Sequence, residues 1–214
     1  AAMLREMVRW CQSRRLPVVY WDTLGAGHPL PRDITVDAAF SVSARNLGRL
    51  GPLAGLLLPG IEPLVGNPGA VEATAPRHPI YVGAFDRRGD SVELAALETL
   101  LGAAAAHGLE ILDSHAGLQG PGAAALRFPA ALAMRVRRRP IAAEARAAIR
   151  QAGLVICSSG IADADFPSWD LLRAIALGAH VLATPTKLGD EELARAVTFA
   201  ADDVSVDYAV QYWH

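Results

Sequence analysis

The stretch LVICSSGIADADFPSWDLLRAIALGAHVLAT, residues 154–184, contains the signals that decide the fold. It opens with an apolar run at 154–158 and closes with a second one at 180–184. Between them, a loop leads to a segment that opens with Pro167 and Ser168 and is apolar along most of its length. Short apolar runs are typical of buried strands, and the longer segment is typical of a helix. We therefore predict a strand, a helix over 168–177 and a second strand, which is one unit of a parallel sheet.

The same alternation precedes and follows this stretch. Strands are predicted at 80–85 and 109–113, and helices at 91–107, 142–151 and 190–200. Strands that alternate with helices indicate a parallel sheet covered on both faces. We predict a Rossmann-like α/β domain at 79–214.

Weaker signals of the same kind lie nearer the amino terminus. They predict a helix at 3–14, a strand at 17–21, a strand and short helix from 37–43 onward, and the apolar run 53–59. Proline and glycine then interrupt the pattern, which is typical of a linker. We predict a small or partial α/β domain at 1–60 and a linker at 61–78.

Composition and charge argue against several classes of protein. With 214 residues and 52% hydrophobic content, the chain can bury a core, yet no apolar run reaches the roughly 20 residues that span a bilayer. The formal net charge is −2 and the dense basic run at 135–139 stands alone, so a nucleic-acid partner is not expected. Cys11 and Cys157 are far apart and the six histidines show no ligand spacing, so we expect a reducing, cytoplasmic setting and no metal.

In an open parallel sheet, ligands bind beyond the carboxyl ends of the strands. The run GAFDRRG, residues 83–89, follows the predicted strand at 80–85. Its glycines would let the backbone approach a phosphate while Arg87 and Arg88 supply positive charge. An ordinary turn with solvated arginines explains the same run.

Polar residues also follow the next two predicted strands. Asp113, Ser114 and His115 follow the strand at 109–113, and Ser158 and Ser159 end the strand at 154–158. A loop histidine such as His115 is either functional or merely structural. These residues should meet at one edge of the sheet.

The sequence resembles a known family in several segments. LRFPAALAMRVRRRPIAAEARAAIRQAGLVICSS (126–159) and FPSWDLLRAIALGAHVLATPT (166–186) resemble the C-terminal half of CgeB-like (spore maturation) glycosyltransferases, which belong to the GT-B class. PVVYWDTLGAGH (17–28), LLLPGIEPLVGNP (56–68) and IYVGAF (80–85) resemble upstream segments of that family in the same order.

The resemblance implies a metal-independent hexosyl or pentosyl transferase that uses a nucleotide-sugar, such as a UDP-sugar or GDP-sugar, as donor substrate and needs no cofactor. It implies a GT-B fold in which one domain holds the acceptor and the other the nucleotide-sugar. If the chain is complete, the acceptor domain is expected to be short, or to be completed by a homo-oligomer or a partner chain. If the chain is a piece of a longer protein, no such completion is needed. The acceptor is not identified.

The resemblance also implies where the donor binds. Its diphosphate is expected over the helix starts after Gly83 and Ser158, with Arg87 or Arg88 neutralising the leaving group. The full set of expected nucleotide-sugar contacts is Gly83, Phe85, Arg87, Arg88, Asp113, His115, Ser158, Ser159, Phe166, Ser168 and Arg173.

Two departures from the family concern acidic residues. The family often places two acids eight positions apart; the first falls on Asp165, and the second is replaced by Arg173, which donates hydrogen bonds but accepts none. Arg173 then pairs with Asp170 or Asp165, contacts the donor phosphate or a substrate carboxylate, or is exposed without a role. Near the amino terminus, an acidic pair of the family is missing, and Asp22 and His28 remain as candidate bases or as capping residues.

Three functions therefore stay open at this stage. The first is sugar transfer with Asp22, His28 and Asp165 as candidate catalytic residues. The second is a catalytically inactive GT-B-like module that binds a nucleotide or a protein. The third is a different Rossmann-like enzyme, such as an epimerase.

Overall fold

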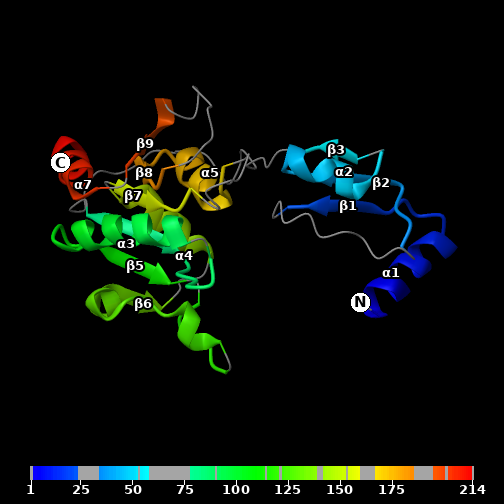
Figure 1. Ribbon diagram of the computed structural model, residues 1–214, viewed down its shortest axis with the longest axis horizontal. Coiled ribbons are helices and arrows are strands. Elements are labelled where there is room, and N and C mark those ends of the chain that lie inside the picture. Colours follow the sequence, from blue (N-terminus) through cyan, green and yellow to red (C-terminus); the bar gives the residue numbers. More distant parts are fainter. Residues whose placement is uncertain are drawn as a thin grey trace. The chain divides into compact units, whose positions relative to one another are not determined.

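The computed structural model describes residues 2–23, 34–52, 54–57, 78–89, 91–113, 115–120, 122–138, 142–152, 154–159, 167–185, 195–200 and 202–213. These residues form two compact units, the first within residues 1–60 and the second within residues 61–214 (Figure 1). Each unit has a parallel sheet of its own.

The first unit holds a small α/β layer. Its elements are α1 (Ala2–Ser13), β1 (Val19–Asp22), β2 (Ala38–Ser41), η1 (Ala44–Asn46), α2 (Leu47–Leu50) and β3 (Ala54–Leu56). The three described strands pair in the order β1-β2-β3, with Val19 opposite Ala38 and Ala39 opposite Ala54. Asp22 and Ser41 therefore end neighbouring strands at the same edge.

The second unit holds a larger sheet. Its described strands are β4 (Pro79–Gly83), β5 (Glu110–Asp113), β6 (Val136–Arg138), β7 (Leu154–Cys157), β8 (Val181–Ala183) and β9 (Val197–Phe199). They are all parallel and lie in the order β6-β5-β4-β7-β8-β9. Numbered within the unit, this order is 3-2-1-4-5-6, which is the Rossmann order. The strands up to β6 are added on one side of β4 and the later strands on the other, so the strand order reverses between β4 and β7.

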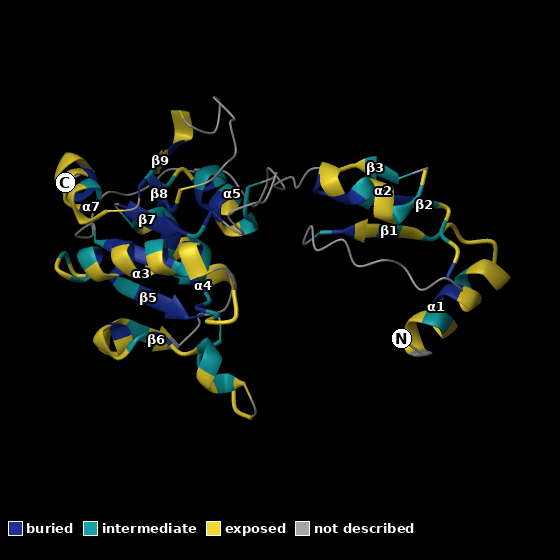
Figure 2. Ribbon diagram, viewed as in Figure 1, coloured by how far each residue is buried: buried dark blue, intermediate teal, exposed yellow. Residues whose placement is uncertain are grey.

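Helices cover both faces of this sheet. On one face, α3 (Ser91–Ala105) and α7 (Asp203–Trp213) pack against alternate strand residues such as Tyr81 and Ile156. On the other, α4 (Ala142–Gln151) and α5 (Trp169–Ala176) pack against residues such as Ile80 and Val155. Strands enclosed on both sides should be apolar throughout, and all four residues of β7 are buried (Figure 2).

Local sequence explains where α5 begins and ends. The Ser168 side chain caps the helix by accepting a hydrogen bond from the Leu171 amide at 3.3 Å. After the helix, Gly178 has φ +77°, the left-handed conformation that glycine adopts freely at a helix terminus.

The prediction of a Rossmann-like parallel sheet with helices on both faces is confirmed, and so are the strands and helix of the stretch 154–184. Two details are corrected. The basic run contains an edge strand, β6, which the sequence analysis missed because arginine hides its strand pattern. The predicted helix 190–200 is wrong at its end, since 197–199 form β9.

Candidate functional site

The carboxyl edge of the second sheet is the candidate site, because ligands of this fold bind outside the point where strand order reverses. Gly83 lies opposite Asp113 in the register, so the ends of β4 and β5 meet there. Ser158 and Ser159 directly follow β7, which pairs with β4 on its other side. The sheet therefore brings together residues that the sequence predicted separately.

Gly83 has a structural reason to be glycine. A Cβ at this position would lie 2.7 Å from the hydroxyl oxygen of Tyr81, closer than side chains tolerate. The Tyr81 hydroxyl donates to the Ala84 carbonyl at 2.7 Å, and burial is the main cause that raises the Tyr81 pKa. Phe85 is 2% exposed and its ring lies 5.3 Å from that of Phe128, so it supports the loop from inside the core.

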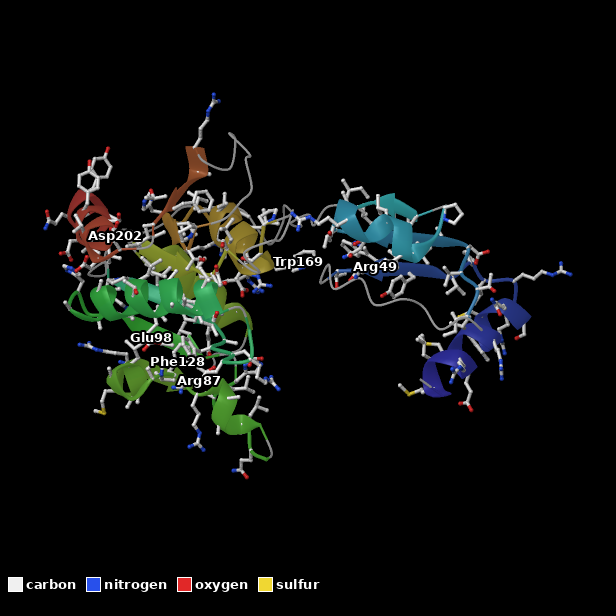
Figure 3. All side chains as sticks on the ribbon, viewed as in Figure 1. Arg49, Arg87, Glu98, Phe128, Trp169 and Asp202 are labelled. Carbon is white, nitrogen blue, oxygen red and sulfur yellow. The ribbon has the colours of Figure 1, made fainter. Side chains whose placement is uncertain are left out.

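The two arginines of the loop have different surroundings. Arg88 donates to both carboxylate oxygens of Asp86, from Nε at 2.8 Å and from Nη2 at 2.7 Å, and this pairing lowers the Asp86 pKa to about 2. Arg87 is exposed, and among the described residues its guanidinium has no ion-pair partner (Figure 3). Arg87 is therefore the cation of this loop that is available to an anionic ligand.

Asp113 and His115 lie at the end of β5. Asp113 is buried and accepts a hydrogen bond from the His115 amide at 2.7 Å, so it shapes the turn after the strand. The Nδ1 atom of His115 is buried without a hydrogen-bond partner among the described residues.

A hydroxyl network links the ends of β7 and β8 to α3. The carboxylate of Glu93 accepts hydrogen bonds from Ser158 at 2.6 Å and from Thr184 at 2.5 Å. The Ser159 amide donates to the Thr184 hydroxyl at 2.8 Å, and the Ser159 hydroxyl donates to the Pro185 carbonyl at 3.1 Å. Glu93 and Thr184 were missed by the sequence analysis.

One sequence signal points to Glu93. It lies four residues before Leu97 and seven before Leu100, on the buried stripe of α3. A glutamate on an apolar stripe needs polar partners inside the protein.

Ser168 and Arg173, at the start of α5 and within it, bind other groups of the protein. Besides capping α5, the Ser168 hydroxyl donates to the Ser158 carbonyl at 2.7 Å. Arg173 pairs with Asp170 at 3.3 Å, and both side chains are about half exposed, so the predicted ion pair is present at the surface. Asp165 and Phe166 lie outside the described residues.

In the first unit, Asp22 is buried at the end of β1. Its carboxylate accepts hydrogen bonds from the Ser41 hydroxyl at 3.0 Å and from the side-chain amide of Asn46 at 3.5 Å. It therefore ties β1 to β2 and η1. The other candidate base, His28, lies outside the described residues.

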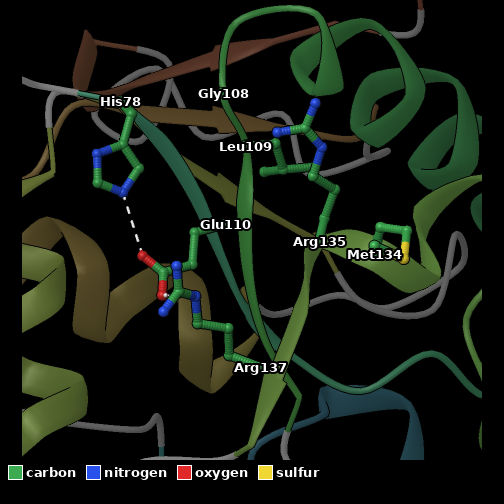
Figure 4. A pocket seen from close by; sticks show the side chains of 7 residues that line it. All are labelled: His78, Gly108, Leu109, Glu110, Met134, Arg135 and Arg137. Atoms are coloured by element: carbon green, nitrogen blue, oxygen red, sulfur yellow. Dashed lines mark hydrogen bonds and ion pairs between the residues drawn. The ribbon is translucent and has the colours of Figure 1, made fainter.

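The amino edge of the second sheet carries a separate surface pocket of about 280 Å³ (Figure 4). Across it, Glu110 pairs with His78 at 3.2 Å and with Arg137 at 2.9 Å. This pocket lies at the opposite ends of the strands from the candidate site.

The described residues show neither a metal-binding cluster nor a membrane-spanning helix. In the part of the chain that the structure describes, no group of three or more His, Cys, Asp or Glu side chains is arranged to hold a metal ion. Within the same residues, no helix has both the length and the apolarity to cross a bilayer.

Comparison with known proteins gives a likeness of fold. No family model matches the sequence. No curated protein matches it either. The structure is similar to the crystal structure of a glycosyltransferase from Rickettsia africae, with a TM-score of 0.60 and 10% identity, over 97% of this chain and 70% of that chain. At that identity the likeness shows a shared fold.

Proposed function

We propose that this protein is a glycosyltransferase that moves a sugar from a nucleotide-sugar, such as a UDP-sugar or GDP-sugar, to an acceptor. The observation that supports the proposal most is the fold of nearly the whole chain, which resembles that of a glycosyltransferase. The sequence segments that resemble CgeB-like enzymes support the narrower proposal that the protein is a glycosyltransferase of the GT-B class. The Rossmann strand order adds a place for a nucleotide, outside β4 and β7.

Arg87 is the residue of the described site best suited to the donor diphosphate. Its side chain is exposed in the loop after β4, whereas Arg88 is held by Asp86. A guanidinium beside the leaving diphosphate would stabilise the charge that grows there as the glycosidic bond breaks. The base that activates the acceptor is proposed to be Asp22 or His28, and Asp165 is proposed to act near the sugar.

Calorimetry with UDP and GDP, together with a transfer assay on their sugars, tests this function. Arg87→Ala should weaken UDP binding by about 1.5–3 kcal/mol, the range for hydrogen bonds to a charged group. Arg137→Ala is the matched control, because it removes an exposed arginine from β6, beside the pocket at the amino edge. Absence of nucleotide binding at millimolar concentration by a folded wild-type protein would contradict the proposal.

A second candidate is a catalytically inactive module that binds a nucleotide or a protein. It is favoured by one observation: the hydroxyls of Ser158, Ser159 and Ser168 all donate to acceptors within the protein. Nucleotide binding without turnover would support this candidate over the transferase.

A further inference from the structure

Glu93 places a buried carboxylate where a phosphate often binds in this fold. It lies in the first turn of α3, the helix that follows β4, and it reaches the hydroxyls that follow β7 and β8. In open α/β sheets, the crevice outside the two central strands commonly presents a helix start to a phosphate. In this chain an acidic side chain occupies that position.

The carboxylate opposes a diphosphate electrostatically. Glu93 is 8% exposed, so water screens its charge poorly, and like charges repel more strongly away from bulk water. An acid in the first turn of a helix also already complements the positive end of the helix dipole. The start of α3 is therefore unfavourable for the donor diphosphate.

The hydroxyls near Glu93 already donate their hydrogens to groups of the protein, so they are poor hydrogen-bond donors for a diphosphate. Each hydroxyl has a single hydrogen to donate. Ser158 donates to Glu93, Ser159 to the Pro185 carbonyl, and Ser168 to the Ser158 carbonyl. A diphosphate could take these donors only by breaking internal hydrogen bonds.

We propose, resting on the glycosyl-transfer function above, that Glu93 is a specificity-determining residue that keeps the donor diphosphate away from Ser158 and the start of α3. The part of the ligand that fits beside Glu93 is neutral and carries hydroxyls, as a ribose or a sugar does, because a carboxylate accepts hydroxyl hydrogens. The diphosphate is then left to Arg87.

Charge removal at Glu93 tests the proposal. Glu93→Gln keeps an oxygen for the Ser158 and Thr184 hydroxyls, and Glu98→Gln is the matched control, since it removes the same charge from an exposed position of α3 (Figure 3). Calorimetry measures the affinities for inorganic pyrophosphate, UDP and uridine. In Glu93→Gln, pyrophosphate and UDP should bind at least tenfold more tightly than in wild type, uridine should bind no more tightly than in wild type, and Glu98→Gln should resemble wild type.

The outcomes separate this proposal from the proposed function. A folded Glu93→Gln protein with unchanged or weaker affinity for pyrophosphate and UDP overturns the role of Glu93, even if wild type binds UDP. If Glu93→Gln binds pyrophosphate more tightly but neither wild type nor the variant binds a nucleotide, the role of Glu93 is supported and the nucleotide-sugar function is overturned. If the glutamine variant does not fold, Glu93→Met replaces it, because methionine is neutral and of similar length. The same affinities are then measured and the same outcomes apply.

Discussion

At the scale of single residues, the loop after β4 shows how one pairing decides the state of a carboxyl group. Two hydrogen bonds from the Arg88 side chain, and one from its amide at 3.0 Å, stabilise ionised Asp86. This pairing leaves Arg87 as the loop's available cation.

The Asp86 titration follows from that geometry. The Arg88 hydrogen bonds hold the Asp86 pKa at about 2, below its ordinary value of 3.8. Because the folded-state pKa is lowered, the pair contributes stability above pH 3.8 and loses it as the pH falls through the lowered value. In NMR titrations of the carboxyl carbon, wild-type Asp86 should remain ionised at about pH 3. In Arg88→Gln the Asp86 pKa should rise from about 2 toward 3.8, because the guanidinium is gone and the hydrogen bond from the amide of residue 88 remains.

The contribution to stability is expected to be small, because both side chains are partly exposed to solvent. Titration of wild-type Asp86 near 3.8 would show that the pair does not persist in solution.

At the scale of elements, α5 depends on Ser168, the N-cap residue directly before the helix. Ser168→Ala removes the side chain that accepts from the Leu171 amide and donates to the Ser158 carbonyl. We expect a loss of roughly 0.5–2 kcal/mol in the free energy of unfolding, measured by urea denaturation. Ser168→Thr keeps the hydroxyl and should retain most of the stability, and equal losses in the two variants would contradict the capping role.

The elements also show which parts of the fold the sequence predicts. Strands such as β7 are predicted well, because a central parallel strand is apolar at every position. The strand β6 lies at a sheet edge, where charged side chains are normal, so its arginines gave no strand signal. The strand β9 is three residues long and too short for a period of two to stand out.

The candidate site is less predictable than the fold. The strand ends that carry Gly83, Asp113 and Ser158 follow from the alternation of elements, since parallel strands end at one edge. The partners of Glu93 do not, because Ser158 is 65 residues away in sequence and Thr184 is 91. Only the three-dimensional packing of α3 on the sheet brings these groups together.

At the scale of the whole molecule, the chain contains two separate sheets, each with buried residues of its own. In the second unit, the two core clusters consist of residues between 80 and 210, and Leu100 is fully buried in one of them. In the first unit, Val42 is fully buried after β2.

We therefore expect the two units to unfold separately. Leu100→Ala should destabilise the second unit by about 2–5 kcal/mol, because it leaves a cavity between α3 and the sheet. Hydrogen exchange measured by mass spectrometry should become faster in β4, β5 and β7, while β1 to β3 keep the wild-type rate. Val42→Ala is the matched control and should give the reverse pattern. Faster exchange in both units after Leu100→Ala would mean that the chain unfolds as one cooperative body, and the division into two units would not describe its stability.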